Sequence, residues 1–259
     1  MKQRILSALC LLPLPVLALY FGTPWFEIFA AAVLTVMGWE WEKMVCGRFG
    51  VSGMVTAVTG VVGVFLLDLT PVVAWSLPAV VAIGVYAAAK KENMPHAGLF
   101  ACGLPYSAYP IMALTCLRQD FGFLATLWVL GTVWAMDTGA YFFGKTIGGP
   151  KMAPKISPKK TWAGLFGGML SSALWGIGVA MVADVGAFGK IAAISAVFGG
   201  VSQVGDLLES AVKRYLGVKD SSDLIPGHGG IYDRTDAILL LAPVALVLMN
   251  FLPALNFWG

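Results

Sequence analysis

The sequence predicts an all-α fold, a polytopic integral membrane protein with about nine transmembrane helices and a cytoplasmic N-terminus. The chain is 58% hydrophobic and 12% charged, and its mean hydropathy is +0.81. Its apolar runs of about 17 residues or more approach the ~20 residues that cross a bilayer. Backbone polar groups in lipid must be satisfied within the segment, so these runs predict helices, whereas a barrel would show alternation.

Nine segments fit this pattern, and we expect the whole chain, 1–259, to form a single membrane domain. Residues 1–120 supply N-terminal spans to which the sequence assigns no role, and residues 121–259 supply the catalytic spans and cytoplasmic loops. The expected spans are Ile5–Phe21, Pro24–Trp39, Val51–Leu67, Pro71–Ala89, Ala97–Leu117, Gly122–Gly144, Trp162–Ala183, Ile191–Leu208 and Ala237–Phe257.

The distribution of basic residues supports this topology. With the N-terminus inside, all Lys and Arg residues except Arg118 and Lys190 fall on the cytoplasmic side, as the positive-inside rule requires. One miscounted span would reverse every later loop and remove the asymmetry. Lys2 and Arg4 before an apolar run also resemble a signal peptide, but Val16-Leu17-Ala18 is a weak cleavage site, so we expect an uncleaved first span.

Charged residues concentrate in one short stretch, Asp206 to Asp236. Its first part places a polar stripe on the end of the eighth span, at helical offsets of 0, 3, 4, 7 and 8. Ion pairing of Glu209 with Lys213 accounts for part of this stripe, but Asp206 has no basic residue within one helical turn. Glycines around His228 permit positive φ and backbone close to a ligand. The polar residues of the stretch are Asp206, Glu209, Ser210, Lys213, Arg214, Lys219, Asp220, His228, Asp233, Arg234 and Asp236.

Asp137 and Tyr141 lie four residues apart, so they share a helical face in an otherwise apolar run. A carboxylate at such depth costs a few kcal/mol unless it is paired, hydrated or metal-bound. Either Asp137 reaches the interface near the end of its span, or it forms a polar wall of a cytoplasm-facing cavity; we favour the cavity. The nearby Gly139–Thr146 matches the letters of a phosphate loop, but it is the aromatic end of a helix without a preceding strand, so the match is false.

A loop rich in lysine and proline and free of acids follows, from Gly148 to Thr161. Ser157 and Pro158 suit the N-cap and first position of a helix, which would place Lys159 and Lys160 in its first turn, against the helix dipole. A phosphate bound there would meet amide donors, both ammonium groups and the hydroxyl of Ser157 or Thr161. The alternative is a basic loop that touches anionic lipid headgroups; we favour the phosphate site.

Carboxylates that converge with hydroxyls and lysines, without a Cys/His ligand set, indicate a hard cation. Mg²⁺ prefers oxygen ligands and is typically held by one or two carboxylates together with substrate phosphates. The residues alone therefore predict Mg²⁺-dependent phosphoryl or nucleotidyl transfer on the cytoplasmic face of a membrane.

These residues resemble the phosphatidate cytidylyltransferase (CDP-diglyceride synthase) family. The long motif Ser210-x-x-Lys213-Arg214-x4-Lys219-Asp220, continued by Pro226-Gly227-His228-Gly229-Gly230-x2-Asp233-Arg234-x-Asp236, is highly specific. Three upstream blocks agree with it: Asp137-x-x-Ala140-Tyr141-x2-Gly144, Ser157-Pro158-Lys159-Lys160-Thr161 and Gly205-Asp206-Leu207-x-Glu209-Ser210. The matches cover Asp137 to Asp236. The resemblance implies that CTP and phosphatidic acid give CDP-diacylglycerol and pyrophosphate in phospholipid biosynthesis. A compact chain that shows no organelle-targeting tract suits a bacterial inner membrane, which is the location we expect.

The resemblance also implies roles for the matching residues. Asp206 and Asp233 are the expected Mg²⁺ ligands, and Asp220 and Asp236 are further members of the carboxylate cluster. Ser157, Lys159, Lys160 and Thr161 would hold the triphosphate or the leaving pyrophosphate; Asp137 and Tyr141 would shape the cavity. The residues expected to act in catalysis or to bind phosphate are Lys213, Arg214, Lys219, His228 and Arg234, with Ser210 in substrate binding.

Some assignments stay open at this point. His228 is a phosphate contact or turn residue rather than an obligatory base. Many family members carry Glu where Ala163 stands here, so no role of that glutamate transfers. Rival functions are a CTP-dependent polyprenol kinase, which would release CDP, and a secondary transporter with Asp137 and Asp206 as ion sites. No nucleic acid is expected as a partner. The sequence determines neither the number of metal ions nor the oligomeric state; a second cation and a homodimer are both compatible with it.

Overall fold

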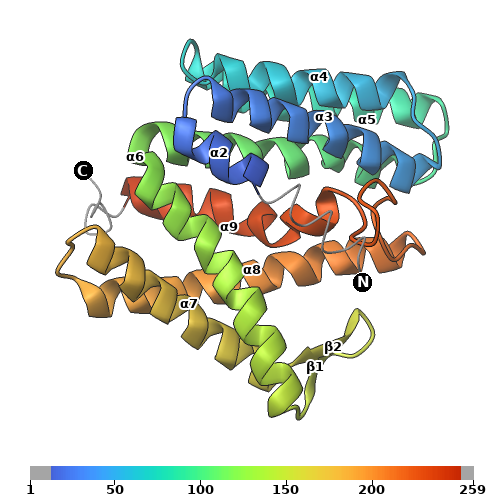
Figure 1. Cartoon of the computed structure of the whole chain (residues 1–259). Coiled ribbons are helices and arrows are strands. Elements are labelled where there is room, and N and C mark those ends of the chain that lie inside the picture. The colour runs from blue at the N-terminus through green and yellow to red at the C-terminus, as the bar shows by residue number, and fades with distance from the viewer. Residues whose placement is uncertain (1–12, 252–259) are drawn as a thin grey trace. The chain divides into compact units, whose positions relative to one another are not determined.

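The computed structural model describes residues 13–251 of the 259-residue chain, and Figure 1 shows their arrangement. Helices dominate, so the all-α prediction is confirmed, with one small antiparallel hairpin added. In chain order the elements are α2 (Pro13–Phe21), α3 (Trp25–Cys46), α4 (Val51–Leu66), α5 (Pro71–Lys91), α6 (Ala97–Thr146), β1 (Lys151–Ala153), β2 (Ser157–Thr161), α7 (Trp162–Val182), α8 (Phe188–Tyr215) and α9 (Tyr232–Phe251).

Five helices among the described residues, α5 to α9, are long and apolar enough to cross a membrane. Helix α6 is two helices that meet at Gly122, whose φ of 80° and ψ of −170° are not helical, and it contains the fifth and sixth predicted spans. The multi-pass membrane fold is thus confirmed. The count of nine spans and the side of the N-terminus stay predictions, and the start of the first predicted span, Ile5–Phe21, lies outside the described residues.

Several helices extend past the predicted spans into charged sequence. Helix α3 continues beyond Trp39 to Cys46, α8 continues beyond Leu208 to Tyr215, and α9 begins at Tyr232 instead of Ala237. Apolar runs mark only the lipid-facing part of a helix, whereas its backbone hydrogen bonds continue wherever charged side chains find partners. The extensions matter because they put six predicted site residues on helices: Ser210, Lys213 and Arg214 on α8, and Asp233, Arg234 and Asp236 on α9.

The predicted helix start at Ser157 and Pro158 is wrong. These residues belong to β2, which pairs with β1 in the register Lys151 to Thr161 and Ala153 to Ser157, with an irregularity between the two pairs. Both strands of a two-stranded sheet are edges, and Pro is tolerated on edges and at irregularities because it donates no ladder hydrogen bond. Helix α7 begins at Trp162 instead, and its N-cap is Thr161, whose hydroxyl accepts a hydrogen bond from Gly164 N at 3.1 Å.

The chain forms two compact units, each described here by itself. Among the described residues, the first comprises 13–119 together with Tyr215–Thr235, and the second comprises Asp120–Arg214 together with 236–251. In the first unit, α3 packs against α2 and α4, and α4 packs against α5 (Figure 1). Tyr232 is fully buried there, its ring 5.6 Å from that of Trp41, and its hydroxyl hydrogen-bonds with Ser107. The loop before α9 is therefore anchored to α3 and to the first half of α6.

Small residues let helices of the second unit approach closely. A Cβ added to Gly139 of α6 would overlap Ser171 of α7, and one added to Gly199 of α8 would lie 2.5 Å from Ser172 Oγ. Trp128 Nε1 donates to Ser195 Oγ at 2.7 Å, which links α6 to α8. Close packing of small residues with interhelical hydrogen bonds is typical of membrane helices. This framework holds the segments that form the polar cavity.

Candidate active site

A polar cavity of about 200 Å³ lies within the second unit. Helix α6 contributes Asp137 and Tyr141, which confirms that these two residues share one face and line a cavity. The other walls come from the hairpin, the start of α7, and α8. Its lining residues are Asp137, Ala140, Tyr141, Lys159, Lys160, Thr161, Gly164, Gln203 and Asp206. Six residues predicted from the sequence to bind substrate or metal thus gather around one space.

The central contact of this cavity is an ion pair. Lys160 Nζ lies 2.5 Å from Asp206 Oδ2, and the two side chains are 18% and 22% exposed. Ser210 Oγ, one helical turn along α8, donates to Asp206 Oδ1 at 3.3 Å. Asp206, which has no basic residue within a turn of its own helix, finds its cation on β2. Both partners are side chains, so the carboxylate can exchange them for other cations without moving the backbone.

The hairpin sets the direction of the two lysines. Gly148 and Gly149 have φ of 68° and 92°, left-handed values that glycine adopts without strain, and they turn the chain back after α6. Trp162 N donates to Pro150 O at 3.1 Å and closes the hairpin at the start of α7. Lys159 and Lys160 therefore extend from a strand that ends at a helix N-terminus, and the predicted conflict between their charge and the first turn of a helix does not arise.

The rest of the polar stripe on α8 has other contacts. Lys213 Nζ lies 2.5 Å from Glu209 Oε2, which confirms the predicted pair, and both side chains are buried. Arg214 Nε donates to Ile156 O at 3.4 Å and joins α8 to the hairpin loop. Asp236, on the part of α9 in this unit, is in electrostatic range of Asp206, Glu209 and Asp137. The second unit thus brings four carboxylates into one neighbourhood.

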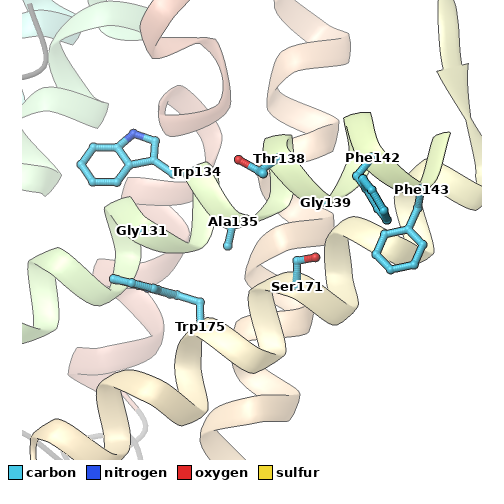
Figure 2. A pocket seen from close by; sticks show the side chains of 9 residues that line it. All are labelled: Gly131, Trp134, Ala135, Thr138, Gly139, Phe142, Phe143, Ser171 and Trp175. Atoms are coloured by element: carbon cyan, nitrogen blue, oxygen red, sulfur yellow. The ribbon is translucent and has the colours of Figure 1, made fainter. Parts of the chain in front are cut away.

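The second unit also contains a larger apolar cavity, of about 450 Å³, between α6 and α7. Figure 2 shows Trp134 and Trp175 at one end and Phe142 and Phe143 at the other, with Ser171 between them. The lining positions on α6 differ from those of the polar cavity. The last turns of α6 therefore present a polar face to one cavity and an aromatic face to the other.

In the first unit, Asp233 is fixed by the loop that precedes it. Its Oδ2 accepts three hydrogen bonds: from Ser221 Oγ at 2.7 Å, Ser221 N at 2.8 Å and Gly230 N at 2.8 Å. A Cβ on Gly229, whose φ is 80°, would lie 2.5 Å from the same oxygen. Two of the three donors are backbone N–H groups, so the orientation of this carboxylate depends on the loop conformation.

The same loop surrounds a second carboxylate, that of Glu40 on α3, which is fully buried. Glu40 Oε1 accepts from Ser222 Oγ at 2.6 Å and from Ile231 N at 2.9 Å. Glu40 Oε2 accepts from Tyr232 N at 2.9 Å and lies 3.3 Å from Ser221 Oγ. A side chain from the N-terminal part of the chain thus binds the backbone at the beginning of α9.

The other predicted residues of the first unit lie on this loop and around it. Gly227 and Gly229 have positive φ, and His228 N donates to Ile225 O at 2.9 Å, so the glycine turn predicted around His228 is confirmed. Arg234 bends back to His228 O, with Nη2 at 2.8 Å. Lys219 and Asp220 are exposed, and in the second unit Ser157 lies on β2 outside the lining of the polar cavity.

The residues around Asp206 suit a hard divalent cation. The cavity offers oxygen donors from Asp137, Thr161, Gln203 and Asp206, the ligand type that Mg²⁺ prefers. Of the four neighbouring carboxylates, Asp206 forms an ion pair with Lys160, and Glu209 forms one with Lys213. Across residues 13–251, no group of three or more His, Cys, Asp or Glu side chains forms a ready metal site. A Mg²⁺ site does not require such a group, because one or two protein carboxylates can hold the ion together with substrate phosphates.

Sequence reasoning missed Glu40, Ser221, Ser222 and Gln203. Gln203 precedes Asp206 by one helical turn in an apolar run, so its position alone was a usable signal. Glu40 also follows an apolar run, and the argument applied to Asp137, that a carboxylate there needs a partner, applies equally to it. The partners themselves were not predictable, because the loop that contacts Glu40 lies about 180 to 190 residues away in the sequence.

Comparison with known proteins gives a consistent result. Residues 2–252 match the cytidylyltransferase family. A phosphatidate cytidylyltransferase of Brucella suis is 33% identical over 252 residues, which covers 93% of this chain and 90% of that protein. Proteins of the same name from Haemophilus influenzae and Pseudomonas aeruginosa are each 33% identical, over 94% and 96% of this chain and 96% and 97% of their own lengths.

Proposed function

The chain belongs to the cytidylyltransferase family, and on that premise we propose that it transfers the cytidylyl group of CTP to phosphatidic acid, with CDP-diacylglycerol and pyrophosphate as products. The observation that supports this best is the polar cavity of the second unit, where Lys159 and Lys160 of the hairpin meet Asp137 and Asp206 of two helices. Ammonium groups for phosphates and carboxylates for a cation are the two components that nucleotidyl transfer needs.

In the proposed reaction a phosphate oxygen of phosphatidic acid attacks the α-phosphorus of CTP. The new bond joins that oxygen to the α-phosphorus, and the bond from the α-phosphorus to the bridging oxygen of the β-phosphate breaks, which releases pyrophosphate. A phosphate monoester is already ionised near neutral pH, so no residue has to remove a proton from the nucleophile. The main tasks of the protein are therefore to position the two anions and to neutralise charge.

The hairpin residues fit the phosphate-binding role. Lys160 would leave Asp206 for a phosphate oxygen when nucleotide binds, and exposed Lys159 would add a second ammonium group. The Thr161 hydroxyl accepts its capping bond from Gly164 N and keeps its own proton, which it can donate to a phosphate. Asp137 and Tyr141 would shape the opposite wall.

We propose that the cofactor is Mg²⁺ and that Asp206 holds it, since the loss of Lys160 to a phosphate would leave this carboxylate without its cation. Bound Mg²⁺ neutralises charge on the phosphates and on the leaving group. The sequence resemblance implies Asp233 as a second ligand, with Asp220 and Asp236 nearby in the motif. We further propose that this chemistry takes place on the cytoplasmic side of a bacterial inner membrane, where CTP is available.

The direct test uses purified protein in detergent micelles with phosphatidic acid, labelled CTP and Mg²⁺. We expect labelled CDP-diacylglycerol and pyrophosphate in equal amounts, and neither without Mg²⁺. In a parallel assay with a polyprenol in place of phosphatidic acid, release of CDP with a phosphorylated polyprenol would identify the kinase alternative instead. Absence of both expected products, from protein shown by its unfolding transition to be folded, would exclude the proposed activity.

A further inference from the structure

The buried carboxylate of Glu40 has no assigned role in the reaction. It lies on α3, outside the part of the chain from which the family resemblance was recognised, and it is fully buried. A buried carboxylate is costly unless its oxygens are hydrogen-bonded. Here its two oxygens accept hydrogen bonds from three donors, Ser222 Oγ, Ile231 N and Tyr232 N, and the Ser221 hydroxyl oxygen lies 3.3 Å from Oε2.

The donors show what Glu40 organises. Two of them are backbone groups at the N-terminus of α9: Ile231 N just before the helix and Tyr232 N at its first residue, where N–H groups lack intrahelical acceptors. Asp233 follows immediately in the first turn. A carboxylate at a helix N-terminus satisfies these donors and interacts favourably with the helix dipole. Glu40 is thus a cap for α9 that comes from a distant helix.

Glu40 and Asp233 are also connected through Ser221. The Ser221 hydroxyl lies 2.7 Å from Asp233 Oδ2 and 3.3 Å from Glu40 Oε2, and its single proton serves the nearer Asp233. A Cβ on Gly230 would overlap both Glu40 Oε1 and Ser221 Oγ, so the loop closes tightly between the two carboxylates. The backbone that holds Asp233 Oδ2 is therefore the backbone that Glu40 holds.

We infer that Glu40 is a positioning residue, which sets the orientation of the Asp233 carboxylate by capping α9 and fixing the loop of residues 221–232. Its full burial and its three hydrogen-bond donors keep it from contacting substrate itself. The catalytic consequence rests on the proposed function, in which Asp233 is a predicted metal ligand. The structural consequence, a loop held by Glu40, does not depend on that function.

The test compares Glu40→Gln with Glu42→Gln. Glu42 is a buried glutamate on the same helix that also accepts two backbone N–H bonds, from Gly50 at 2.6 Å and Gly53 at 3.0 Å, but these lie before and within α4. In Glu40→Gln, the amide NH₂ must face the backbone N–H of either Ile231 or Tyr232, and neither group can accept a hydrogen bond from it. We expect hydrogen–deuterium exchange of Ile231 and Tyr232 to accelerate in Glu40→Gln, and that of Gly50 and Gly53 to accelerate in Glu42→Gln.

In the activity assay, we expect Glu40→Gln to lose about 10- to 100-fold in turnover per folded molecule and to need about tenfold more Mg²⁺ for half-maximal rate, the range for residues that orient metal ligands. Glu42→Gln should stay within about twofold of the wild type on both measures. If Glu40→Gln does not fold, Ser222→Ala removes the shortest of the Glu40 bonds without touching Asp233 and should show the same changes at smaller size.

The inference is overturned if Glu40→Gln, or Ser222→Ala in its place, leaves exchange at Ile231 and Tyr232 and the Mg²⁺ requirement unchanged. An inactive wild type has a separate meaning. It would exclude the proposed function, while the exchange experiment would still decide whether Glu40 holds the loop.

Discussion

Asp206 and Asp233, the two carboxylates predicted to bind metal, are held in opposite ways. Asp206, in the second unit, contacts an ammonium group and a hydroxyl, both on side chains. Asp233, in the first unit, has one oxygen fixed by three donors, two of them backbone N–H groups. Side-chain partners can be exchanged by rotamer changes, whereas backbone donors move only with the loop. Asp206 is therefore suited to change partners during a reaction, and Asp233 is suited to keep one orientation.

The largest effect is expected at Asp206. Asp206→Asn removes the charge that faces Lys160 and, in the proposed function, a ligand of Mg²⁺. We expect turnover to fall on the order of 10³-fold, with the thermal unfolding midpoint in detergent nearly unchanged because the side chain is partly exposed. A rate close to that of the wild type would remove Asp206 from the metal site.

At Asp233 the expected loss of turnover is similar, but stability should also suffer. Asp233→Asn weakens an acceptor of three hydrogen bonds, so we expect about 1–2 kcal/mol of destabilisation in addition to the loss of activity. Denaturant unfolding of Asp206→Asn and Asp233→Asn in the same detergent measures the difference. Equal stability of the two variants would contradict the distinction between exchangeable and backbone-fixed carboxylates.

The lysines of the hairpin offer a finer test of the exchangeable pair. Lys160 reaches Asp206, whereas Lys159 is more exposed, so Lys160→Ala should cost on the order of 10²-fold in kcat/KM for CTP and Lys159→Ala about tenfold. Steady-state kinetics with varied CTP separates them. Equal losses would mean that pairing with Asp206 gives Lys160 no special role.

Thr161 and Ser157 test the boundary between hairpin and helix. Thr161→Ala removes the N-cap of α7 and should lower the free energy of unfolding by about 1 kcal/mol. Ser157→Ala, on the strand, should change it by less than about 0.5 kcal/mol, as for other substitutions away from a cap. The free energy of unfolding of both variants is measured with denaturant. If Ser157→Ala were the more destabilising of the two, Ser157 would be the helix N-cap, contrary to the structure.

Ser210 should give the smallest effect. Its bond to the Asp206 carboxylate is 3.3 Å long, at the long end of the range, so we expect it to contribute only about 0.5 kcal/mol although the acceptor is charged. Ser210→Ala should thus lower turnover about twofold. A loss as large as that of Lys160→Ala would show that Asp206 is less free to change partners than its two contacts indicate.

Composition and motif spacing determined the fold class, the approximate positions of the helices and most of the residues that line the polar cavity. Apolar runs report where lipid contacts a helix, and Asp137 and Tyr141 share a face because helical periodicity is local. The same local rules failed at Ser157, where pairing with Lys151–Ala153 outweighed a good N-cap sequence.

Only the tertiary structure decided which partner each charge has. Lys160 meets Asp206 because a hairpin turns back between two helices, and Glu40 meets the start of α9 across a sequence separation of about 190 residues. Such contacts depend on how helices pack, and packing is determined by many small and aromatic residues together. The sequence by itself predicted which groups bind phosphate and a cation; the fold determined that one carboxylate is held by exchangeable side chains and the other by backbone.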